Sequence, residues 1–168
     1  MEACRSFGLQ FAIAAGARVD HELERCAKLE HAKTLGAFAT INYGAEPKWS
    51  EAVMKLTEGA GVHHVLEVGG SGTLAQSLAS LAPGGHVALI GGLAGFGGDI
   101  PATALIGRNA GATGIFVGSR ADFEAMNAFI VRHTLRPVVD RSFDFGAAAA
   151  AYAYMESGSH FGKIVIRH

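Results

Sequence analysis

The chain has 168 residues, of which 49% are hydrophobic and 17% charged, enough apolar material for a folded domain and too much for a disordered chain. A formal net charge of −1 gives no electrostatic basis for binding nucleic acid or an anionic membrane. Two cysteines, Cys4 and Cys26, are too few for a disulfide framework or a four-thiolate zinc site. With so few cysteines, a reducing cytoplasm is the expected location. No apolar run is long enough to cross a bilayer.

The elements predicted in chain order alternate between helix and strand. The stretch FGLQFAIAAGARV at residues 7–19 is typical of a helix followed by a strand in a nucleotide-binding unit. From residue 38 onward, short β-branched runs alternate with longer helical stretches. This alternation predicts strands over 38–43, 63–70, 86–93 and 112–119, and helices over 48–61, 72–85, 101–110 and 120–134.

Single residues set the ends and faces of these predicted helices. Ser50 is the expected N-cap of the first helix after residue 38, and Gly59 or Gly61 is expected to end it. Pro83 and the glycines after it are expected to stop the next helix. The helix over 120–134 has an apolar face made of Phe123, Met126, Phe129 and Ile130.

The predicted strands are nearly continuously apolar, which indicates a sheet that is covered on both faces. Repeated strand–helix–strand units with such strands predict a doubly wound, mostly parallel α/β fold with helices on both faces. Glycines follow three of the strands, at Gly69–Gly70, Gly91–Gly92 and Gly118. Because ligands of this architecture lie across the carboxyl ends of the strands, these glycines favour a cofactor cleft over plain turns.

Several segments together resemble the cofactor domain of the zinc-type alcohol dehydrogenases, in the medium-chain dehydrogenase/reductase superfamily. The segments are GLQFAIAAGARV, KLEHAKTLGA, INY, VLEVGGSGTLAQSLASLAPGGHVALIGGLAG and SGSHFGKIVI, and their order and spacing carry the resemblance. The resemblance implies a hydride-transferring oxidoreductase that uses NAD or NADP. It also implies a catalytic zinc in another domain and a dimeric or tetrameric assembly.

The resemblance implies ten cofactor-binding positions and no catalytic or metal-binding residue in this chain. Three lie beside the adenosine side of the cleft, three beside the nicotinamide ribose and three face the nicotinamide, and the last is a lysine near the cleft. A lysine exposed beside a C-terminal strand is an equally good interpretation of that position. In this order the residues are Val68, Gly69 and Gly70; Ile90, Gly91 and Gly92; Phe116, Val117 and Gly118; and Lys163.

The chain departs from this family at its start. Glu2, Ala3 and Arg5 stand where the phosphate turn should have glycine or small residues, and Gly8 falls inside the following helix. A glutamate there would repel the pyrophosphate. The strand before the turn, which is the first central strand of the sheet, is absent, and so is the domain with the zinc ligands. We therefore expect a truncated cofactor domain over 1–134 and a tail over 135–168 that packs toward the absent domain.

A second departure is the charged stretch DHELERC at residues 20–26. Buried charges make a parallel strand improbable there, so the sequence predicts a helix with Asp20 as N-cap and Gly36 as C-cap. Leu23 would occupy the position at which an acidic residue normally reads the adenosine ribose. Local frameshifts over residues 1–6 and 20–26 would explain both departures, since coding strings exist that yield the family's residues when shifted.

Other interpretations of single motifs are weaker. VLEVGGSG is similar to the first motif of methyltransferases that bind S-adenosylmethionine, but the next strand lacks the expected acid. His63 and His64 are adjacent on a strand and would point to opposite faces, which disfavours a shared metal. Ser119 and Asp122 indicate a capped helix start. Tyr152 and Tyr154 suit core or interface packing, and no nucleophile–base pair is evident.

The sequence thus favours the cofactor-binding half of an NAD(P)-dependent oxidoreductase that binds its cofactor weakly and turns over no substrate alone. The alternative is a non-catalytic remnant, or an oligomerisation module that pairs through the edge strand TGIFVG at 113–118 and the C-terminal tail.

Overall fold

The computed structural model describes residues 2–23, 26–95, 97 and 102–168. It is a mixed α/β structure in which every strand pair is parallel, which confirms the predicted fold class. The strands are β1 (Asp20–Leu23), β2 (Ala39–Asn42), β3 (Val62–Glu67), β4 (Leu81–Leu89), β5 (Gly111–Gly114), β6 (Val139–Asp144) and β7 (Lys163–Arg167). The helices are α1 (Glu2–Ala14), α2 (Cys26–Thr34), α3 (Trp49–Leu56), α4 (Leu74–Ala79), α5 (Ala102–Ile106), α6 (Arg120–Arg132) and α7 (Ala148–Glu156), with 3-10 turns η1 (Gly70–Gly72) and η2 (Phe145–Ala147).

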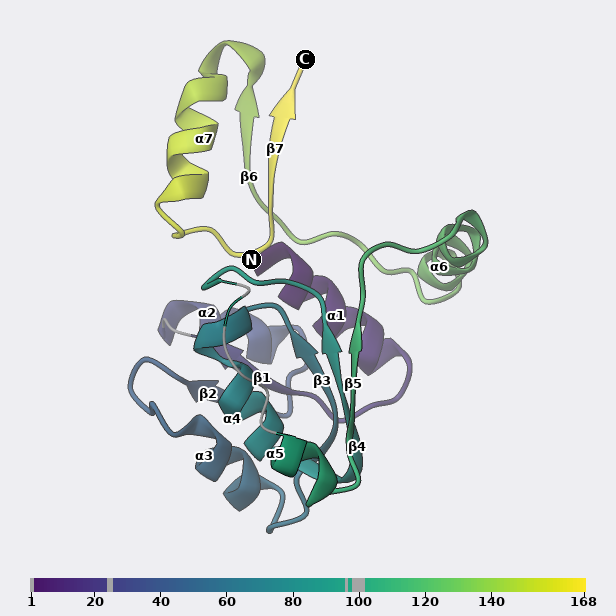
Figure 1. Ribbon diagram of the computed structural model, residues 1–168. Coiled ribbons are helices and arrows are strands. Elements are labelled where there is room, and N and C mark those ends of the chain that lie inside the picture. Colours follow the sequence, from purple (N-terminus) through teal and green to yellow (C-terminus); the bar gives the residue numbers. More distant parts are fainter. Residues whose placement is uncertain (1, 24–25, 96, 98–101) are drawn as a thin grey trace.

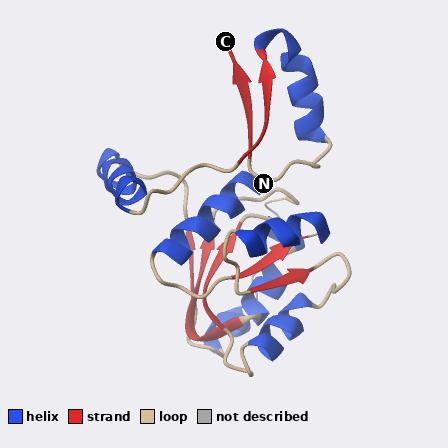
Figure 2. Cartoon of the chain, turned by 180° about the vertical axis from the view of Figure 1, so that it is seen from behind, coloured by secondary structure: helices blue, strands red, loops and turns tan. Residues whose placement is uncertain are grey.

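The strands form three separate hydrogen-bonded sheets, ordered β1-β2, β3-β4-β5 and β6-β7. Helices α1 and α2 lie on one side of the first two sheets, and α3, α4 and α5 lie on the other (Figure 1). Strands β3, β4 and β5 point toward the end of the molecule where α1 begins, and β1 and β2 are turned relative to them (Figure 2). Within the described residues, no strand pairs with both β1 and β3.

Three apolar clusters hold these layers together. The first joins α1 and α2 to the segment before β7, the second joins β2, α3 and β3, and the third packs α4 and α5 against β3, β4 and β5. Because Phe161 belongs to the first cluster, the C-terminal part of the chain is docked on the body through a buried aromatic ring. The buried members are Leu9, Leu29, Ala32 and Phe161; Ile41, Trp49 and Val53; and Leu78, Leu81 and Val87.

The helix predicted from Asp20 to Gly36 is wrong in its first half. Asp20 begins strand β1, which pairs in parallel with β2 from Asp20↔Ala39 to Leu23↔Asn42, and helix α2 starts only at Cys26. Strand β2 supplies hydrogen-bond partners for the backbone N–H and C=O groups of this stretch. In isolation, the stretch would pair these groups within a helix. Partial burial raises the pKa of the Asp20 carboxyl, and the Arg18 charge opposes that rise. The predicted end is confirmed, since Gly36 follows α2 with φ +99° and its N–H donates to the Lys33 carbonyl oxygen (2.9 Å).

The helix α3 shows a second correction. Ser50 is not its N-cap, a position held by Lys48, but a buried residue of the first turn. Its hydroxyl (2.7 Å) and its backbone N–H (3.0 Å) both donate to Oε1 of Gln76 in α4. Ser50 therefore ties two helices together. The predicted end at Gly59 agrees with the structure, in which that residue has φ +85° and donates to the Met54 carbonyl oxygen (2.7 Å).

The boundary between α4 and β4 lies earlier than predicted. Helix α4 ends at Ala79 rather than near Pro83, and β4 begins at Leu81, so Pro83 belongs to the strand. The register between β3 and β4 shifts at this point, which leaves room for a residue that has no N–H to donate. The guanidinium of Arg108 donates to the carbonyl oxygens of Ala79 (3.2 Å) and Leu81, satisfying acceptors at the end of α4 and the start of β4.

The chain beyond β5 differs most from the prediction. Strand β5 ends at Gly114, so the segment 115–118 leaves the sheet instead of extending it to residue 119. Helix α6 forms as predicted, but none of its residues is buried, and Phe123 of its apolar face is 60% exposed. It stands away from the sheet (Figure 1), with Phe129 in contact with Phe11 of α1 at a ring-centroid distance of 5.8 Å.

The residues from β6 to β7 form a strand–helix–strand unit of their own. Asp140 joins its parts, since Oδ2 accepts from the Tyr154 hydroxyl (2.7 Å) and Oδ1 from the Phe161 N–H (3.0 Å). Hydrogen bonding to Asp140 raises the pKa of the Tyr154 hydroxyl. The buried Lys28 of α2 donates to the Gly158 carbonyl oxygen (2.8 Å), which adds a polar attachment to the body. Tyr154 is therefore a packing residue, while Tyr152 is 61% exposed.

Candidate cofactor site at the carboxyl ends of β3 and β4

Two glycine pairs meet at one edge of the three-stranded sheet. Gly69–Gly70 follows β3 and Gly91–Gly92 follows β4, and these parallel strands end side by side. Backbone bonds join the two segments: the Ile90 N–H donates to the Glu67 carbonyl oxygen (2.8 Å), and the Ala94 N–H donates to the Gly69 carbonyl oxygen (2.8 Å). The glycines that follow two of the predicted strands therefore lie side by side at the carboxyl edge of the sheet.

The glycines permit a close approach that no other residue would allow. Gly70 has φ +82°, and a Cβ at this position would lie 2.4 Å from the Gly95 carbonyl oxygen and 2.6 Å from Gly92 Cα. A Cβ on Gly91 would lie 2.9 Å from the Val68 carbonyl oxygen. The two turns consequently bring bare backbone to the sheet edge, which is how this architecture accepts a flat, phosphate-bearing ligand.

A buried carboxylate, Glu67, organises the first of these turns. The residue is 3% exposed. Its Oε1 accepts from the N–H groups of Gly69 (2.7 Å) and Gly70 (3.0 Å) and from the Thr73 hydroxyl (2.6 Å), while Oε2 accepts from the Ser77 hydroxyl. These donors compensate for the loss of water around the charge. Glu67 thereby fixes the conformation of Gly69–Gly70 and the start of α4.

The positioning role of Glu67 was not identified from the sequence. The signal was an acidic residue at the end of a strand, followed by the residues VGGSG. The methyltransferase interpretation treats this acid as a ligand-holding group. In the structure its oxygens are occupied by the chain's own donors, including Thr73 and Ser77, so the carboxylate is not presented to a ligand. Glu67 is a positioning residue for the turn.

The other predicted cofactor positions vary in how close they lie to the glycine turns. Val68 is buried and Ile90 is 37% exposed, and both flank the turns directly in sequence. The Ile115 N–H donates to the Leu89 carbonyl oxygen (2.8 Å), so the following segment leaves from beside the end of β4. Phe116 is 96% and Val117 77% exposed there, which makes them available to a ligand or a partner.

Lys163 lies in a different neighbourhood. It begins β7, its N–H donates to the Val138 carbonyl oxygen (2.7 Å), and its Nζ lies 5.5 Å from the ring centroid of Phe7 in α1. The structure thus places Lys163 beside α1 through a cation–π contact. Its contacts favour neither the cofactor role nor the surface interpretation over the other.

Gly118 leads into the start of α6, where the predicted cap is confirmed. The Ser119 hydroxyl accepts from the Asp122 N–H (3.2 Å), and the Asp122 carboxylate accepts from the Ser119 N–H (2.7 Å) and hydroxyl (2.8 Å). This arrangement is a capping box. Its effect is to fix where the exposed segment containing Phe116 ends.

Replacing Ser119 with alanine is expected to destabilise the first turn of α6 by about 1 kcal/mol, because the Asp122 N–H loses its acceptor. The expected readout is faster amide hydrogen exchange at that turn, with exchange in β4 unchanged.

The bonds from Ser119, first its hydroxyl and then its N–H, lower the pKa of Asp122. A depressed carboxyl pKa stabilises the native state above about pH 3.9, and the effect disappears as the pH falls through the folded pKa. Amide protection at the cap that is the same before and after protonation of Asp122 would contradict this account.

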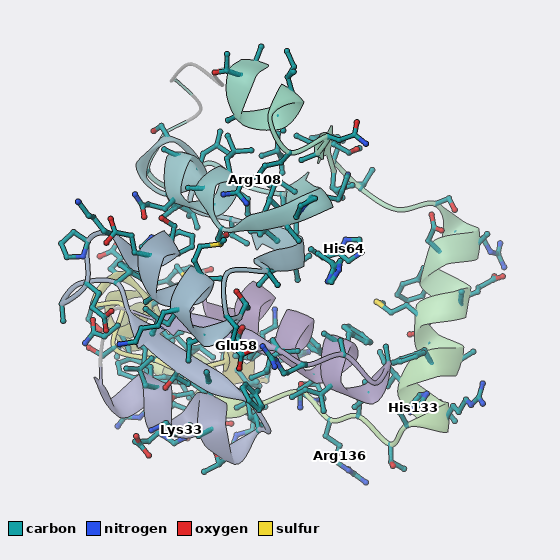
Figure 3. All side chains as sticks on the ribbon, turned by 90° about the horizontal axis from the view of Figure 1, so that it is seen from below. Lys33, Glu58, His64, Arg108, His133 and Arg136 are labelled. Carbon is teal, nitrogen blue, oxygen red and sulfur yellow. The ribbon has the colours of Figure 1, made fainter. Side chains whose placement is uncertain are left out.

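His64 of β3 belongs to a row of side chains that crosses the sheet to His86 and Thr113. The ring centroid of His64 lies 6.1 Å from that of His86 on β4, and His86 Nε2 lies 2.9 Å from the Thr113 hydroxyl on β5. His64 points away from the sheet toward the side on which α6 lies (Figure 3). Among the side chains that the structure describes, no three metal-ligating groups come together. The side chains of Cys4 and Cys26 lie outside the described ones.

The start of α1 is where the family's phosphate turn would lead into the helix. Helix α1 begins at Glu2 and contains Gly8, as the sequence predicts. A Cβ on Gly8 would lie 2.7 Å from Cδ1 of Leu66, so this glycine lets α1 pack closely on β3. The side chains of Glu2, Ala3 and Arg5 lie outside the described ones.

Parallel strands, helices on both sides and paired glycine turns at the carboxyl edge define a Rossmann-like α/β domain. The chain belongs to the zinc-binding dehydrogenase family, whose model matches residues 6–132. This match confirms the resemblance to the zinc-type alcohol dehydrogenases of the medium-chain dehydrogenase/reductase superfamily.

Individual relatives agree with this family. The chain is 46% identical over 166 residues to a zinc-type alcohol dehydrogenase-like protein of Schizosaccharomyces pombe, covering 96% of this chain and 48% of that protein. A solved NAD-dependent alcohol dehydrogenase has a TM-score of 0.86 and 30% identity over 97% of this chain and 47% of its own. A mycobacterial protein complexed with NADPH has a TM-score of 0.81 and 25% identity, covering 97% and 54%. The chain therefore spans about half the length of these relatives. No helix among the described residues is both long and apolar enough to cross a membrane.

Proposed function

We propose that this chain is the nicotinamide-cofactor-binding part of an NAD(P)-dependent oxidoreductase that exchanges hydride between an alcohol and a carbonyl compound. The observation that carries the proposal is the close packing of the two glycine turns. A Cβ on Gly70 would overlap the backbone of Gly92 and Gly95. The alcohol dehydrogenase with NAD in its name and the mycobacterial protein complexed with NADPH support a nicotinamide cofactor. A cytoplasmic location is part of the same proposal.

The residues around the turns fit such a cofactor. Val68–Gly70 would lie beside its adenosine side and Ile90–Gly92 beside the nicotinamide ribose, with Phe116–Gly118 facing the nicotinamide ring. The bound cofactor supplies the hydride acceptor or donor, and the chain's own part is to position it with backbone groups held by Glu67. The described residues do not fit a catalytic zinc, because they bring no three ligands together.

We also propose that residues 1–134 and 135–168 act as two parts, with the second packing toward a catalytic domain of the kind that the family implies. The β6–α7–β7 unit projects from the body of the molecule (Figure 1). An exposed projection of this kind suits a contact with a further domain.

We expect the chain alone to bind cofactor weakly and to turn over no substrate. Glu2 is the first residue of α1, where the helix dipole favours an anion and a carboxylate opposes one. Calorimetric titration with NADH and NADPH is expected to give dissociation constants on the order of millimolar, without oxidation of alcohols. Binding at micromolar concentrations or tighter would contradict this proposal.

The variant Glu2→Gln tests whether the negative charge of Glu2 weakens cofactor binding. Removing a charge from the first turn is expected to tighten binding up to about fivefold, corresponding to roughly 1 kcal/mol. Glu51→Gln is the matched control, because Glu51 is an exposed residue in the first turn of α3. If both variants bind alike, the charge at the start of α1 is not what weakens binding.

A second candidate function is pairing with other chains through the segment after β5. It is favoured by the exposure of Ile115 (46%), Phe116 (96%) and Val117 (77%) on one short stretch. Sedimentation over a range of concentrations tests it: Phe116→Asp is expected to weaken an oligomer if the segment is its interface. A monomer at all concentrations would exclude self-association, and absence of co-purification with a full-length dehydrogenase would exclude mixed assemblies.

A further inference from the structure

The two glycine turns are joined by a serine as well as by backbone groups. Ser71, in the 3-10 turn η1, donates twice to the segment after β4: its hydroxyl to the Ala94 carbonyl oxygen (2.8 Å) and its N–H to the Gly95 carbonyl oxygen (3.1 Å). Among the described residues of the two turns, this hydroxyl is the only side-chain group that is hydrogen-bonded from one turn to the other. It is therefore the one hydrogen bond between the turns that a change of side chain removes.

The Ser71 hydroxyl does not cap the helix beside it. A serine at a helix start commonly accepts a hydrogen bond from an N–H group of the first helical turn. Here the N-cap position of α4 is held by Thr73 and that of η1 by Gly69, and neither makes a side-chain capping bond. The Ser71 hydroxyl instead reaches a carbonyl oxygen 23 residues further along the chain. It therefore acts between the two turns and not within one of them.

The segment that accepts both bonds lies on the surface. Ala94 and Gly95 are exposed, and Gly95 has φ +112°, a conformation that favours glycine. Otherwise this segment is held by backbone bonds, among them those from the Ala94 N–H to the Gly69 carbonyl oxygen (2.8 Å) and from the Gly95 N–H to the Gly92 carbonyl oxygen (2.9 Å). An exposed segment with few buried groups opens at low cost. Ser71 consequently limits how far the second turn moves from the first.

We propose that Ser71 is a positioning residue, which couples the two halves of the cofactor site through its hydroxyl. This inference rests on the proposed function, in which the first turn lies beside the adenosine side of the cofactor and the second beside the nicotinamide ribose. A dinucleotide contacts both turns at once, so their relative position must match its length. With the hydroxyl bond in place, a ligand on the first turn also orders the second. Without that bond, the two turns respond more independently.

The strength of one hydrogen bond sets the size of this coupling. A net hydrogen bond between neutral groups changes an equilibrium by about two- to tenfold. Because coupling between two sites is reciprocal, a ligand group on the second turn orders the first turn by the same factor. Removing the Ser71 hydroxyl is therefore expected to weaken NADPH binding by about two- to tenfold, since NADPH must then bring the two turns together itself.

The test titrates the whole ¹⁵N-labelled chain with ADP, which carries the adenosine half of the cofactor and no nicotinamide ribose. Two-dimensional NMR follows the amide shifts of Gly69 and Gly70 on the first turn and of Gly91 and Gly92 on the second. In fast exchange all four shifts scale with the same bound fraction, so the ratio of second-turn to first-turn shifts does not depend on affinity. We expect this ratio to fall by about twofold or more in Ser71→Ala.

Two further variants separate the hydroxyl from other effects of the substitution. Ser71→Thr keeps a hydroxyl donor and is expected to restore the shift ratio. Ser157→Ala is the matched control, because the exposed Ser157 hydroxyl also donates to a backbone carbonyl oxygen, that of Tyr154 (2.7 Å), but belongs to the β6–α7–β7 unit. It is expected to leave both the ratio and NADPH binding unchanged.

A measurement without ligand examines the bond directly. In Ser71→Ala, amide hydrogen exchange at Ala94 is expected to accelerate by about two- to tenfold, because the segment after β4 opens more often. Exchange in β6 is expected to stay the same, and Ser71→Thr is expected to return the Ala94 rate toward that of the unaltered chain.

Several results would overturn the inference. Unchanged exchange at Ala94 in Ser71→Ala would do so without reference to any ligand. An unchanged shift ratio or unchanged NADPH affinity in Ser71→Ala would do so while the proposed function stands, since the glycine amides still respond to the cofactor. Losses that Ser71→Thr does not restore would assign the effect to something other than the hydroxyl. If NADPH moves none of the four glycine amides in the unaltered chain, the proposed function fails and this inference fails with it.

Discussion

The variant Glu67→Ala is expected to lose roughly 3–5 kcal/mol of stability, the range found when one member of a buried charged network is removed. Four donors lose their acceptor: the N–H groups of Gly69 and Gly70 and the hydroxyls of Thr73 and Ser77. Because these groups lie at the first glycine turn, residual NADPH binding is expected to disappear with them. Thermal unfolding followed by circular dichroism measures the first effect, and calorimetric titration measures the second.

The variant Glu67→Gln separates shape and hydrogen bonding from charge. Its remaining oxygen can keep the three bonds to Gly69, Gly70 and Thr73, while the new NH2 group donates to the Ser77 hydroxyl, which is able to accept. We expect a loss less than half of that of Glu67→Ala. Glu51→Ala, at an exposed carboxylate of α3, serves as the control and should change stability by no more than about 0.5 kcal/mol. Equal losses for Glu67→Ala and Glu51→Ala would contradict the network.

The variant Gly70→Ala is expected to cost roughly 2–5 kcal/mol and to disrupt the candidate site. About 1–2 kcal/mol comes from placing a side chain at φ +82°, and the rest from overlap with Gly95 and Gly92. The turn must open to relieve a 2.4 Å approach to the Gly95 carbonyl oxygen. Denaturant unfolding gives the stability loss, and amide shifts at Gly91 and Gly92 report the opening.

Gly59→Ala is the matched control for this substitution. Gly59 has φ +85°, nearly the same backbone conformation, but a Cβ there meets nothing within 4 Å. It should show only the backbone cost of roughly 1–2 kcal/mol. The difference between the two variants isolates the close packing of the turns. If Gly70→Ala costs no more than Gly59→Ala, the turns are not packed as the structure shows.

The parallel α/β fold and the meeting of the glycine pairs could be predicted because they depend on local pattern. Uninterrupted apolar runs such as HVALIGGL indicate strands covered on both faces, and parallel strands place their carboxyl ends together. The charged strand β1 could not be predicted, since Asp20 and its neighbours favour a strand only once β2 offers an edge. Tertiary pairing outweighed local preference there.

The details of the site depend on contacts between distant residues. Ser50 has the chemistry of an N-cap, yet its partner is Gln76, 26 residues away. The role of Glu67 requires four donors to converge, which residue spacing alone does not show. The helix expected to extend to Pro83 is shortened because the register shift between β3 and β4 accommodates that proline in the strand.

The most direct test of the central claim is a titration of the ¹⁵N-labelled chain with NADPH, followed by two-dimensional NMR. We expect the amide shifts to move in fast exchange, with the largest changes at Gly69, Gly70, Gly91 and Gly92 and small ones in α7. Fast exchange accords with dissociation constants on the order of millimolar. No movement at these four amides at saturating NADPH, or changes concentrated elsewhere in the chain, would contradict the assignment of this edge as the cofactor site.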